Sequence, residues 1–157
     1  MLGELKAIHA DLREAIAELA VAVRNAEPDE GVVSAARLKL TKLSRRRRSL
    51  IEFTICPSFH DAPPAAAAAV ADLLLEGARL TVKSSEHIGR WTMSAIRADW
   101  PGYQRASAEM RGSMLKRIER EAAVLYPLLE AKVRATSGLS SAEIIDTHRT
   151  AQKARIG

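Results

Sequence analysis

Glu121 and Arg117 are charged residues at positions where the sequence pattern predicts an interior. Apolar residues recur at helical spacing on both sides of them, and this stripe consists of Met110, Met114, Ile118, Leu125 and Leu128. Glu121 falls in the middle of the stripe, and Arg117 lies one turn before it on nearly the same side. A buried charge is costly alone but tolerable when it is paired and hydrogen-bonded. We therefore expect a carboxylate and guanidinium pair that faces the interior.

Three further residues could join this pair. His9 and His87 each stand in the middle of an apolar helical stripe. Arg47 belongs to the arginine run 45–48, and because four consecutive residues sweep about 300° around a helix, at least one must face inward. The register favours Arg47, with Arg48 as the alternative. If the helices alternate in direction, we expect one polar layer that gathers His9, Arg47, His87, Arg117 and Glu121.

Four long helices would position these residues. The helix-breaking stretches EPDEG, CPSFHDAPP and WPG separate four segments with helical periodicity, which are 2–26, 30–56, 64–99 and 102–136. Long helices joined by short loops pack economically as an up-and-down antiparallel four-helix bundle. We therefore predict an all-α fold in which this bundle occupies residues 1–136, with a bend at Pro127. After the ATSGLSS linker, we expect residues 137–157 to form a tail or a short helix.

The composition agrees with helices packed on helices. Hydrophobic residues make up 47% of the chain and aromatic residues 4%, with eight glycines among 157 residues, about the size of one domain. The most apolar run, 63–80, is interrupted by Asp72 and Glu76, so we expect no membrane span. The single cysteine, Cys56, cannot form an intramolecular disulfide, and we interpret it as an inert small hydrophobe.

Charge and motif content limit the possible partners and activities. The N-terminal sequence MLGELKAIHADLRE is the start of an amphipathic helix rather than a signal peptide, so we expect a cytoplasmic location. The net charge of +5 could attract a phosphate-bearing partner. No aromatic interleaving, zinc-finger spacing or helix-turn-helix signature accompanies the arginine run, so we expect no nucleic-acid partner. We also expect no enzymatic activity, because no nucleophile stands beside a base and an acid at motif spacing.

The layout of these residues resembles the hemerythrin-like (HHE cation-binding) family. Each half of that family's bundle supplies a histidine from its first helix and an H-x-x-x-E pair from its second, followed by an L-[YF]-P ending. The matching features here are His9, His87 within EHIGRW, Glu121 with LYP at 125–127, and a partial ICP at 55–57. The resemblance covers residues 1 to about 135 and implies a four-helix bundle with a non-haem diiron cofactor.

The chain departs from the family pattern at the positions that would complete the metal site. Arg47 and Arg117 stand where the second-helix histidines are expected, and Ile51 stands where the first-half glutamate is expected. Glu52 is adjacent but points about 100° away on a helix. Because a guanidinium stays protonated, two arginines would repel iron. We therefore predict that the diiron site is degenerate, that no cofactor is bound, and that a polar Arg, His and Glu core replaces it.

Three functional hypotheses follow. The first is a hemerythrin-like binding or sensory protein whose polar core holds a small anion or whose surface takes a protein partner. The alternative is a non-haem iron protein that binds dioxygen or a small oxidant. Its metal ligands would be His9, His87 and Glu121, supplemented by Asp11, Glu52 or Glu86. The third is a helical adaptor that acts through the basic surface of 30–56 or through the tail 137–157.

Overall fold

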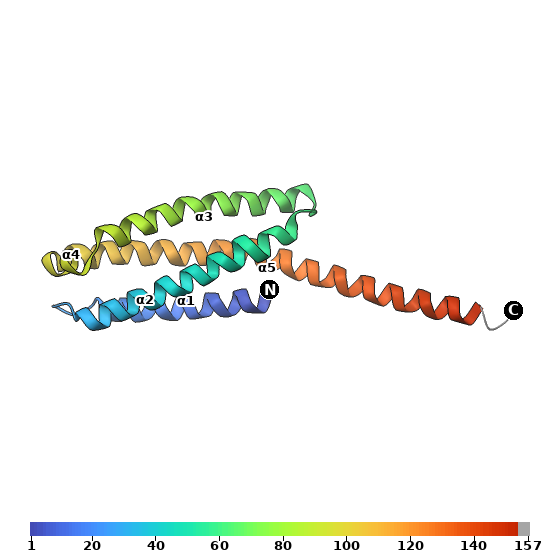
Figure 1. Cartoon of the computed structure of the whole chain (residues 1–157), viewed down its shortest axis with the longest axis horizontal. Coiled ribbons are helices and arrows are strands. Elements are labelled where there is room, and N and C mark those ends of the chain that lie inside the picture. The colour runs from blue at the N-terminus through green and yellow to red at the C-terminus, as the bar shows by residue number, and fades with distance from the viewer. Residues whose placement is uncertain (154–157) are drawn as a thin grey trace.

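The chain is all-α. A computed structural model describes residues 1–153, and the side chains of residues 1–137; within this part every regular element is helical. The described part has four long α-helices and one short one, and Figure 1 shows their arrangement. Their bounds are α1 Leu2–Ala22, α2 Glu30–Leu50, α3 Pro64–Arg90, α4 Met93–Ala98 and α5 Trp100–Lys153. The prediction of an all-α chain is therefore confirmed.

The core lies where α1 meets α2 and α5, and where α3 meets α5. Leu5, Ile8 and Leu12 of α1 are completely buried, as are Ile118 and Leu125 of α5. Their spacing of three, four and seven residues places each set on one side of its helix. Each fully buried Leu or Ile side chain contributes about 1.5–3 kcal/mol relative to an exposed one, so these stripes hold α1 and α5 at a fixed mutual register.

The first helix ends at Ala22, four residues before the predicted end at residue 26. Backbone carbonyl groups after this end accept hydrogen bonds from side chains of α5 instead of from the amides of a further helical turn. Trp100 Nε1 donates to the carbonyl of Asn25 at 2.9 Å, and Gln104 Nε2 donates to the carbonyl of Val23 at 2.7 Å. These bonds satisfy acceptors that the end of a helix leaves without partners.

The single helix predicted for 64–99 is wrong, because the structure divides this segment into α3 and α4. Trp91 follows α3 and is buried, and Thr92 then begins α4 by accepting a hydrogen bond at its side-chain hydroxyl from the Ala95 amide. Asp99 separates α4 from α5, and its carboxylate accepts from the Gly102 amide at 2.9 Å. Two side-chain caps within eight residues therefore turn the chain where periodicity alone predicted a straight helix.

The end of α2 departs from regular α-helix. Leu50 is its last residue, and a π-helical turn Ile51–Ile55 and a 3-10 turn Cys56–Phe59 follow. Both Ile51 and Ile55 are buried, so the wider turn keeps them in the core. The predicted helix 30–56 covers the same segment, but a change of helical pitch within a buried apolar run leaves no mark in the spacing of its residues.

The predicted linker at 135–141 does not interrupt α5, which continues to Lys153. A glycine inside a helix costs only about 1 kcal/mol relative to alanine, and no proline follows Pro127. The helix break predicted there is therefore absent, while the predicted C-terminal unit 137–157 stays a prediction, and its residues 154–157 lie outside the described part. Pro127 lies within α5, whose orange part changes direction before the helix projects beyond the others (Figure 1).

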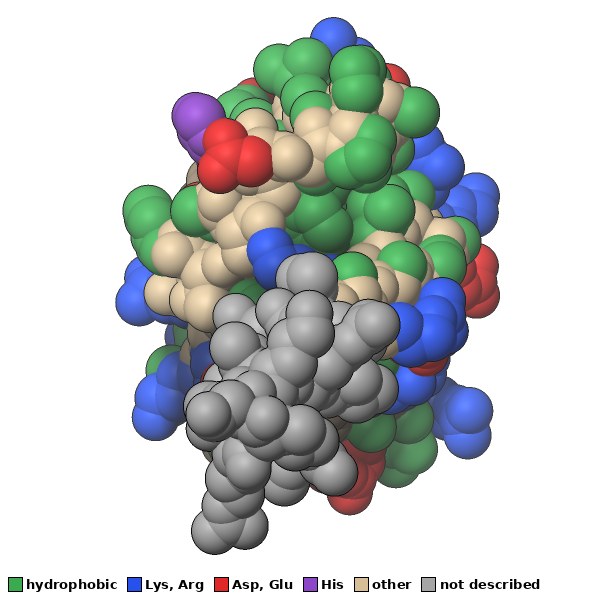
Figure 2. All heavy atoms as spheres, turned by 90° about the vertical axis from the view of Figure 1, so that its right-hand side faces the viewer, with side chains coloured by type: hydrophobic (Ala, Val, Ile, Leu, Met, Phe, Trp, Pro, Cys, Tyr) green, Lys and Arg blue, Asp and Glu red, His purple; other side chains and the backbone are tan. Residues whose placement is uncertain are grey.

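The surface at the end where α5 projects is mixed in character. Hydrophobic side chains gather near the start of α3, at the top of the molecule, while Lys and Arg side chains are spread around both sides (Figure 2). Among the described residues, none of the helices combines the length and the apolar character that crossing a membrane requires.

Candidate functional site

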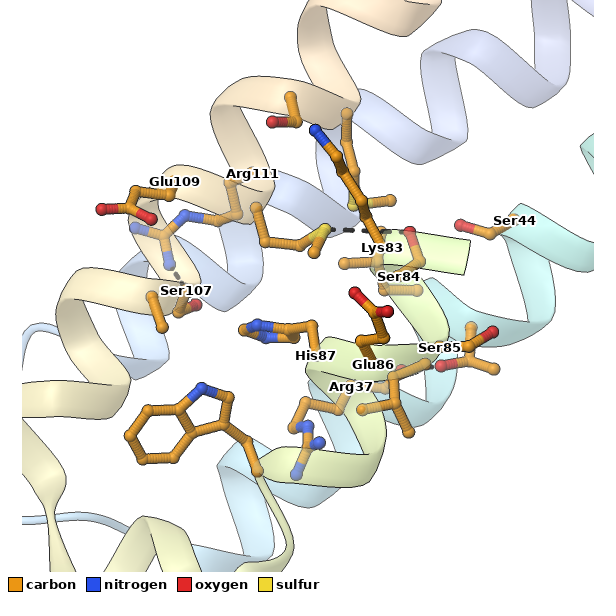
Figure 3. A pocket seen from close by; sticks show the side chains of 18 of the residues that line it. Arg37, Ser44, Lys83, Ser84, Ser85, Glu86, His87, Ser107, Glu109 and Arg111 are labelled. Carbon is orange, nitrogen blue, oxygen red and sulfur yellow. Dashed lines mark hydrogen bonds between the residues drawn. The ribbon is translucent and has the colours of Figure 1, made fainter. Parts of the chain in front are cut away.

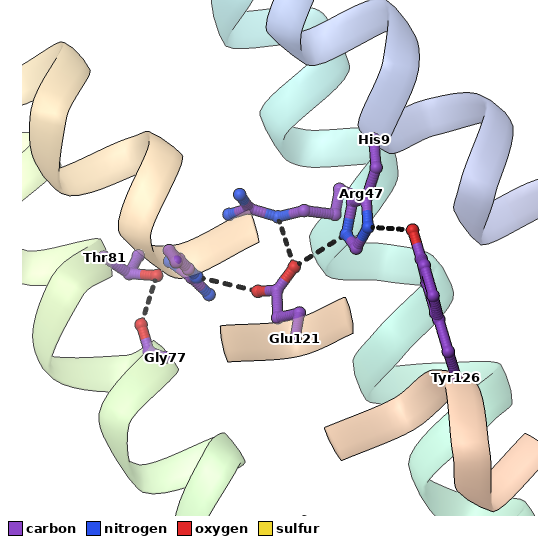
Figure 4. A network of polar contacts seen from close by, with 7 residues as sticks. His9, Arg47, Gly77, Thr81, Glu121 and Tyr126 are labelled. Atoms are coloured by element: carbon purple, nitrogen blue, oxygen red, sulfur yellow. Dashed lines mark hydrogen bonds and ion pairs between the residues drawn. The ribbon is translucent and has the colours of Figure 1, made fainter. Parts of the chain in front are cut away.

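Glu121 is the centre of a buried polar network between α1, α2 and α5. Its side chain is almost fully enclosed, with 2% of the residue exposed. Arg117, one turn earlier on α5, donates from Nε to Glu121 Oε1 at 2.9 Å. His9 Nε2 on α1 lies 3.0 Å from Oε2, and Arg47 Nε on α2 lies 3.6 Å from the same oxygen (Figure 4). One carboxylate thus faces three basic side chains from three helices.

The geometry around His9 fixes the tautomer of its ring. An ionised carboxylate can only accept, so the 3.0 Å contact places a proton on His9 Nε2, which donates to Glu121. The other ring nitrogen, Nδ1, lies 2.8 Å from Tyr126 Oη on α5. In the neutral ring Nδ1 accepts from the Tyr126 hydroxyl. The completely buried His9 ring is therefore held at both nitrogens by α5.

Arg47 is the group whose bonding capacity is least satisfied. Only 4% of the residue is exposed, and its Nε and Nη1 atoms have no hydrogen-bond partner within the described part of the chain. The 3.6 Å approach to Glu121 is an ion pair rather than a hydrogen bond. Burial lowers the pKa of Arg47, and the charge of Arg117 adds to this effect while Glu121 opposes it. Two guanidinium groups therefore share one carboxylate.

The side chain of Arg117 lies against α3 at a glycine. A Cβ atom at Gly77 would come within 2.9 Å of Arg117 Nη2, closer than real Cβ contacts allow. Gly77 is itself buried in α3, and its carbonyl accepts from the Thr81 hydroxyl at 2.9 Å (Figure 4). The absence of a side chain at position 77 therefore provides the space that the guanidinium occupies.

The environment keeps Glu121 ionised. Burial, the largest single effect, would raise the pKa of its carboxyl group. The hydrogen bond from His9 and the charges of Arg47 and Arg117 together outweigh burial, so the pKa lies below its ordinary value. At neutral pH the network thus contains one negative and two positive charges before any contribution from His9.

A groove of about 980 Å³ opens beside this network, between α2, α3 and α5. Arg47 and Arg117 line its inner end. Within residues 1–137, nine Lys and Arg residues line the groove, against three acidic residues. The basic residues are Arg37, Arg45, Arg47, Arg48, Lys83, Arg90, Arg105, Arg111 and Arg117, and the acidic ones are Glu86, Asp99 and Glu109. Figure 3 shows Arg37, Lys83, Glu86, Glu109 and Arg111 among the side chains that line it. The groove is therefore strongly cationic.

His87 lies in this groove rather than in the network around Glu121. Its ring is half-buried, 6.2 Å from the Tyr103 ring, and its pKa is lowered by burial and by the charge of Arg37. It follows Gly77, which contacts Arg117, by ten residues, or about 15 Å along the helix. The expected polar layer therefore brings together His9, Arg47, Arg117 and Glu121 but not His87. Helical spacing predicts which side of a helix is buried, but it does not predict which residues of neighbouring helices lie at the same level.

These residues do not fit a paired iron centre. Among residues 1–137, no three His, Cys, Asp or Glu side chains gather closely enough to hold a metal ion. Of the supplementary ligands considered above, Asp11 and Glu86 are exposed and Glu52 is half-buried beyond the end of α2. His9 and Glu121 do meet, but two guanidinium groups occupy the space around the carboxylate where cations would bind.

Several functional residues escaped the sequence analysis. Tyr126 was noted only as part of LYP, although its hydroxyl holds His9. Gly77 looked like an ordinary helical glycine, and no sequence signal shows that Arg117 packs against it. Arg37 and Arg111 belong to no motif in the sequence, so only the approach of α2 to α5 reveals that they line one groove.

The chain was also compared with known proteins. No family model, no curated protein and no solved structure matches it. The resemblance to the hemerythrin-like family therefore stays a prediction, and function must be inferred from the geometry of the site.

Proposed function

We propose that this chain is a hemerythrin-like protein in which an up-and-down four-helix bundle has exchanged its diiron centre for an anion-binding core. In this proposal it is a cytoplasmic binding or sensory module rather than an enzyme. A small anion, a carboxylate or a phosphate, enters the groove and is held at its inner end by Arg47 and Arg117. The residues 1–136 form the bundle, and His9 and Glu121 position the two guanidinium groups.

The observation that carries the proposal is the unsatisfied hydrogen-bonding capacity of Arg47. Buried polar groups are nearly always hydrogen-bonded, and an unpaired buried charge is costly. Two Arg47 nitrogen atoms lack partners, and Glu121 supplies one negative charge against two positive ones. An anion beside Arg47 would correct both deficits at once. Guanidinium groups suit this task because their planar donors match the oxygens of carboxylate and phosphate.

A titration with inorganic phosphate tests the proposal. The wild-type chain should bind orthophosphate with saturable heat, and Arg47→Met should weaken binding by about tenfold or more because a charge-assisted bond is lost. Arg79→Met is the matched control, since Arg79 is an exposed residue of α3 that does not line the groove. No saturable binding to the wild type, or equal loss in both variants, would overturn the anion site.

Elemental analysis separates this proposal from the iron-protein alternative. Protein produced with iron supplied should contain far less than one iron per chain, because the guanidinium groups of Arg47 and Arg117 lie around Glu121. A content of two irons per chain, with an absorption band of an oxo-bridged ferric pair, would defeat the proposal and favour the alternative.

A further inference from the structure

The groove is longer than a single small anion requires. Arg47 and Arg117 line one end of it, and Arg37 and Arg111 line it farther along. Arg37 precedes Arg47 by ten residues of α2, which is about 15 Å along the helix axis. One orthophosphate cannot contact both arginine pairs at once, whereas a ligand with a chain of anionic groups can.

The cations at the far end are not neutralised by neighbouring acids. The Arg37 guanidinium lies over the Tyr103 ring at 5.7 Å, and Arg111 donates to the Ser107 hydroxyl at 2.7 Å. Within the described part of the chain, the three acidic residues of the groove form no ion pair with its basic ones. Like charges along one concave wall repel each other and raise the local concentration of anions. The far end is therefore a second positively charged subsite, which is suited to an anion.

From these two subsites we infer that the groove binds a small molecule with several linked phosphate groups. One phosphate lies at Arg47 and Arg117, and the others extend towards Arg37 and Arg111. This inference rests on the proposed anion site and adds the class of ligand. Planar guanidinium groups at both ends are suited to phosphate oxygens, which they contact by paired hydrogen bonds.

The size and walls of the groove favour a small ligand over a nucleic acid. Its volume of about 980 Å³ lies at the upper end of the range for small-molecule sites. Proteins that bind single-stranded nucleic acid stack bases on exposed aromatic rings. The aromatic residues of this groove, Trp91 and Tyr103, are only 6% and 1% exposed. The groove therefore offers a nucleic acid no well-exposed aromatic ring for base stacking, whereas its nine basic side chains can contact a chain of phosphates.

Calorimetric titrations with orthophosphate and tripolyphosphate at constant ionic strength test the inference on the full chain. Tripolyphosphate should bind the wild type at least about tenfold more tightly than orthophosphate, because it reaches both subsites. The double variant Arg37→Gln with Arg111→Gln should lose that advantage while its affinity for orthophosphate changes by less than about twofold. Arg47→Met should weaken both ligands.

A charge-matched control distinguishes a subsite from general attraction. Arg79→Gln with Arg134→Gln removes the same charge from exposed positions that do not line the groove, and both affinities should be retained. If the first double variant unfolds, Lys83→Gln with Arg90→Gln makes the same test at exposed positions of α3 that line the groove away from Gly77 and Arg117. Equal losses in groove and control variants would overturn the inference.

The remaining outcomes separate this inference from the proposed function. Orthophosphate binding that depends on Arg47, with no tighter binding of tripolyphosphate, would overturn the inference and leave the anion site standing. No binding of either ligand would overturn both. A single-stranded oligonucleotide that binds more tightly than tripolyphosphate and loses affinity in the groove variants would overturn the assignment to a small molecule.

Discussion

His9 Nε2 donates a hydrogen bond to Glu121 Oε2 across 3.0 Å, although 112 residues separate the two in the sequence. The bond joins the first helix of the chain to the last, and both side chains are buried. Since the carboxylate accepts from Arg117 at its other oxygen, Glu121 cannot move towards one partner without leaving another. The carboxylate therefore couples the positions of α1, α2 and α5.

Removing the negative charge should destabilise the fold far more than removing one positive charge. Glu121→Gln leaves Arg47 and Arg117 buried without a counter-charge, and we expect the free energy of unfolding to fall by about 3–5 kcal/mol at pH 7. Arg47→Met removes the excess charge with similar volume, so we expect a change below about 1.5 kcal/mol. Urea unfolding followed by circular dichroism measures both. Similar losses in the two variants would contradict this account.

Acid should weaken the fold through Glu121. Its pKa is lower in the folded state than in the unfolded chain, so its contribution is fully present above the unfolded value of about 4.5 and is lost as pH falls through the folded pKa. We expect the stability difference between wild type and Glu121→Gln, measured by urea unfolding from pH 7 to 3, to shrink in this acid range. Glu119→Gln, at an exposed position of α5, is the control. A difference that is independent of pH would refute the assignment.

Replacing Gly112 by alanine should stabilise the protein, whereas replacing Gly77 by alanine should not. Alanine favours a helix over glycine by about 0.8–1 kcal/mol. At Gly112 of α5 an added Cβ meets nothing within 4 Å, so Gly112→Ala should stabilise the protein by roughly that amount. At Gly77 the Cβ would displace the Arg117 guanidinium from its place beside Glu121, so Gly77→Ala should be neutral or destabilising. Thermal unfolding measures both, and equal stabilisation would show that Arg117 moves aside freely.

Cys56 should be unreactive in the folded protein. Burial raises the pKa of its thiol to about 11, and the carboxylates of Glu52 and Glu121 add to the shift. The reactive thiolate is therefore scarce at pH 8, and only 9% of the residue is exposed. A chromogenic disulfide reagent should label Cys56 slowly in native protein and rapidly in denaturant. Fast native labelling would show that the end of α2 opens readily.

The spacing of apolar residues was sufficient to predict which side of α1 is buried and most of the buried side of α2. It placed His9 and Glu121 inside, and among four consecutive arginines it selected Arg47, which is the buried one. It could not predict how far along its axis each helix lies relative to its neighbours, because sliding a helix along its axis leaves the same side of it buried. His87 shows the result: it follows Gly77 by ten residues of α3, so it lies about 15 Å farther along that helix than the glycine beside Arg117.

Other features depend on contacts that no local pattern contains. Gly77 and Arg117 belong to different helices, and the fit between them exists only after α3 packs on α5. The charge of the groove likewise arises from basic residues on three helices, and apart from Arg47 and Arg117 each of them looks like an ordinary surface residue in its own segment. The predicted break after residue 136 failed for a different reason, since one glycine costs too little to end a long helix.

The turn between α1 and α2 depends on residues that are synthesised much later. The carbonyls of Val23 and Asn25 accept their hydrogen bonds from Gln104 and Trp100, across 81 and 75 positions of sequence. A hairpin of α1 and α2 alone would leave these carbonyls to water, and its end would fray. Local contacts usually form first during folding because closing a long loop costs more entropy. Here the shortest connection between two long helices becomes fixed only after one of the longest loops has closed.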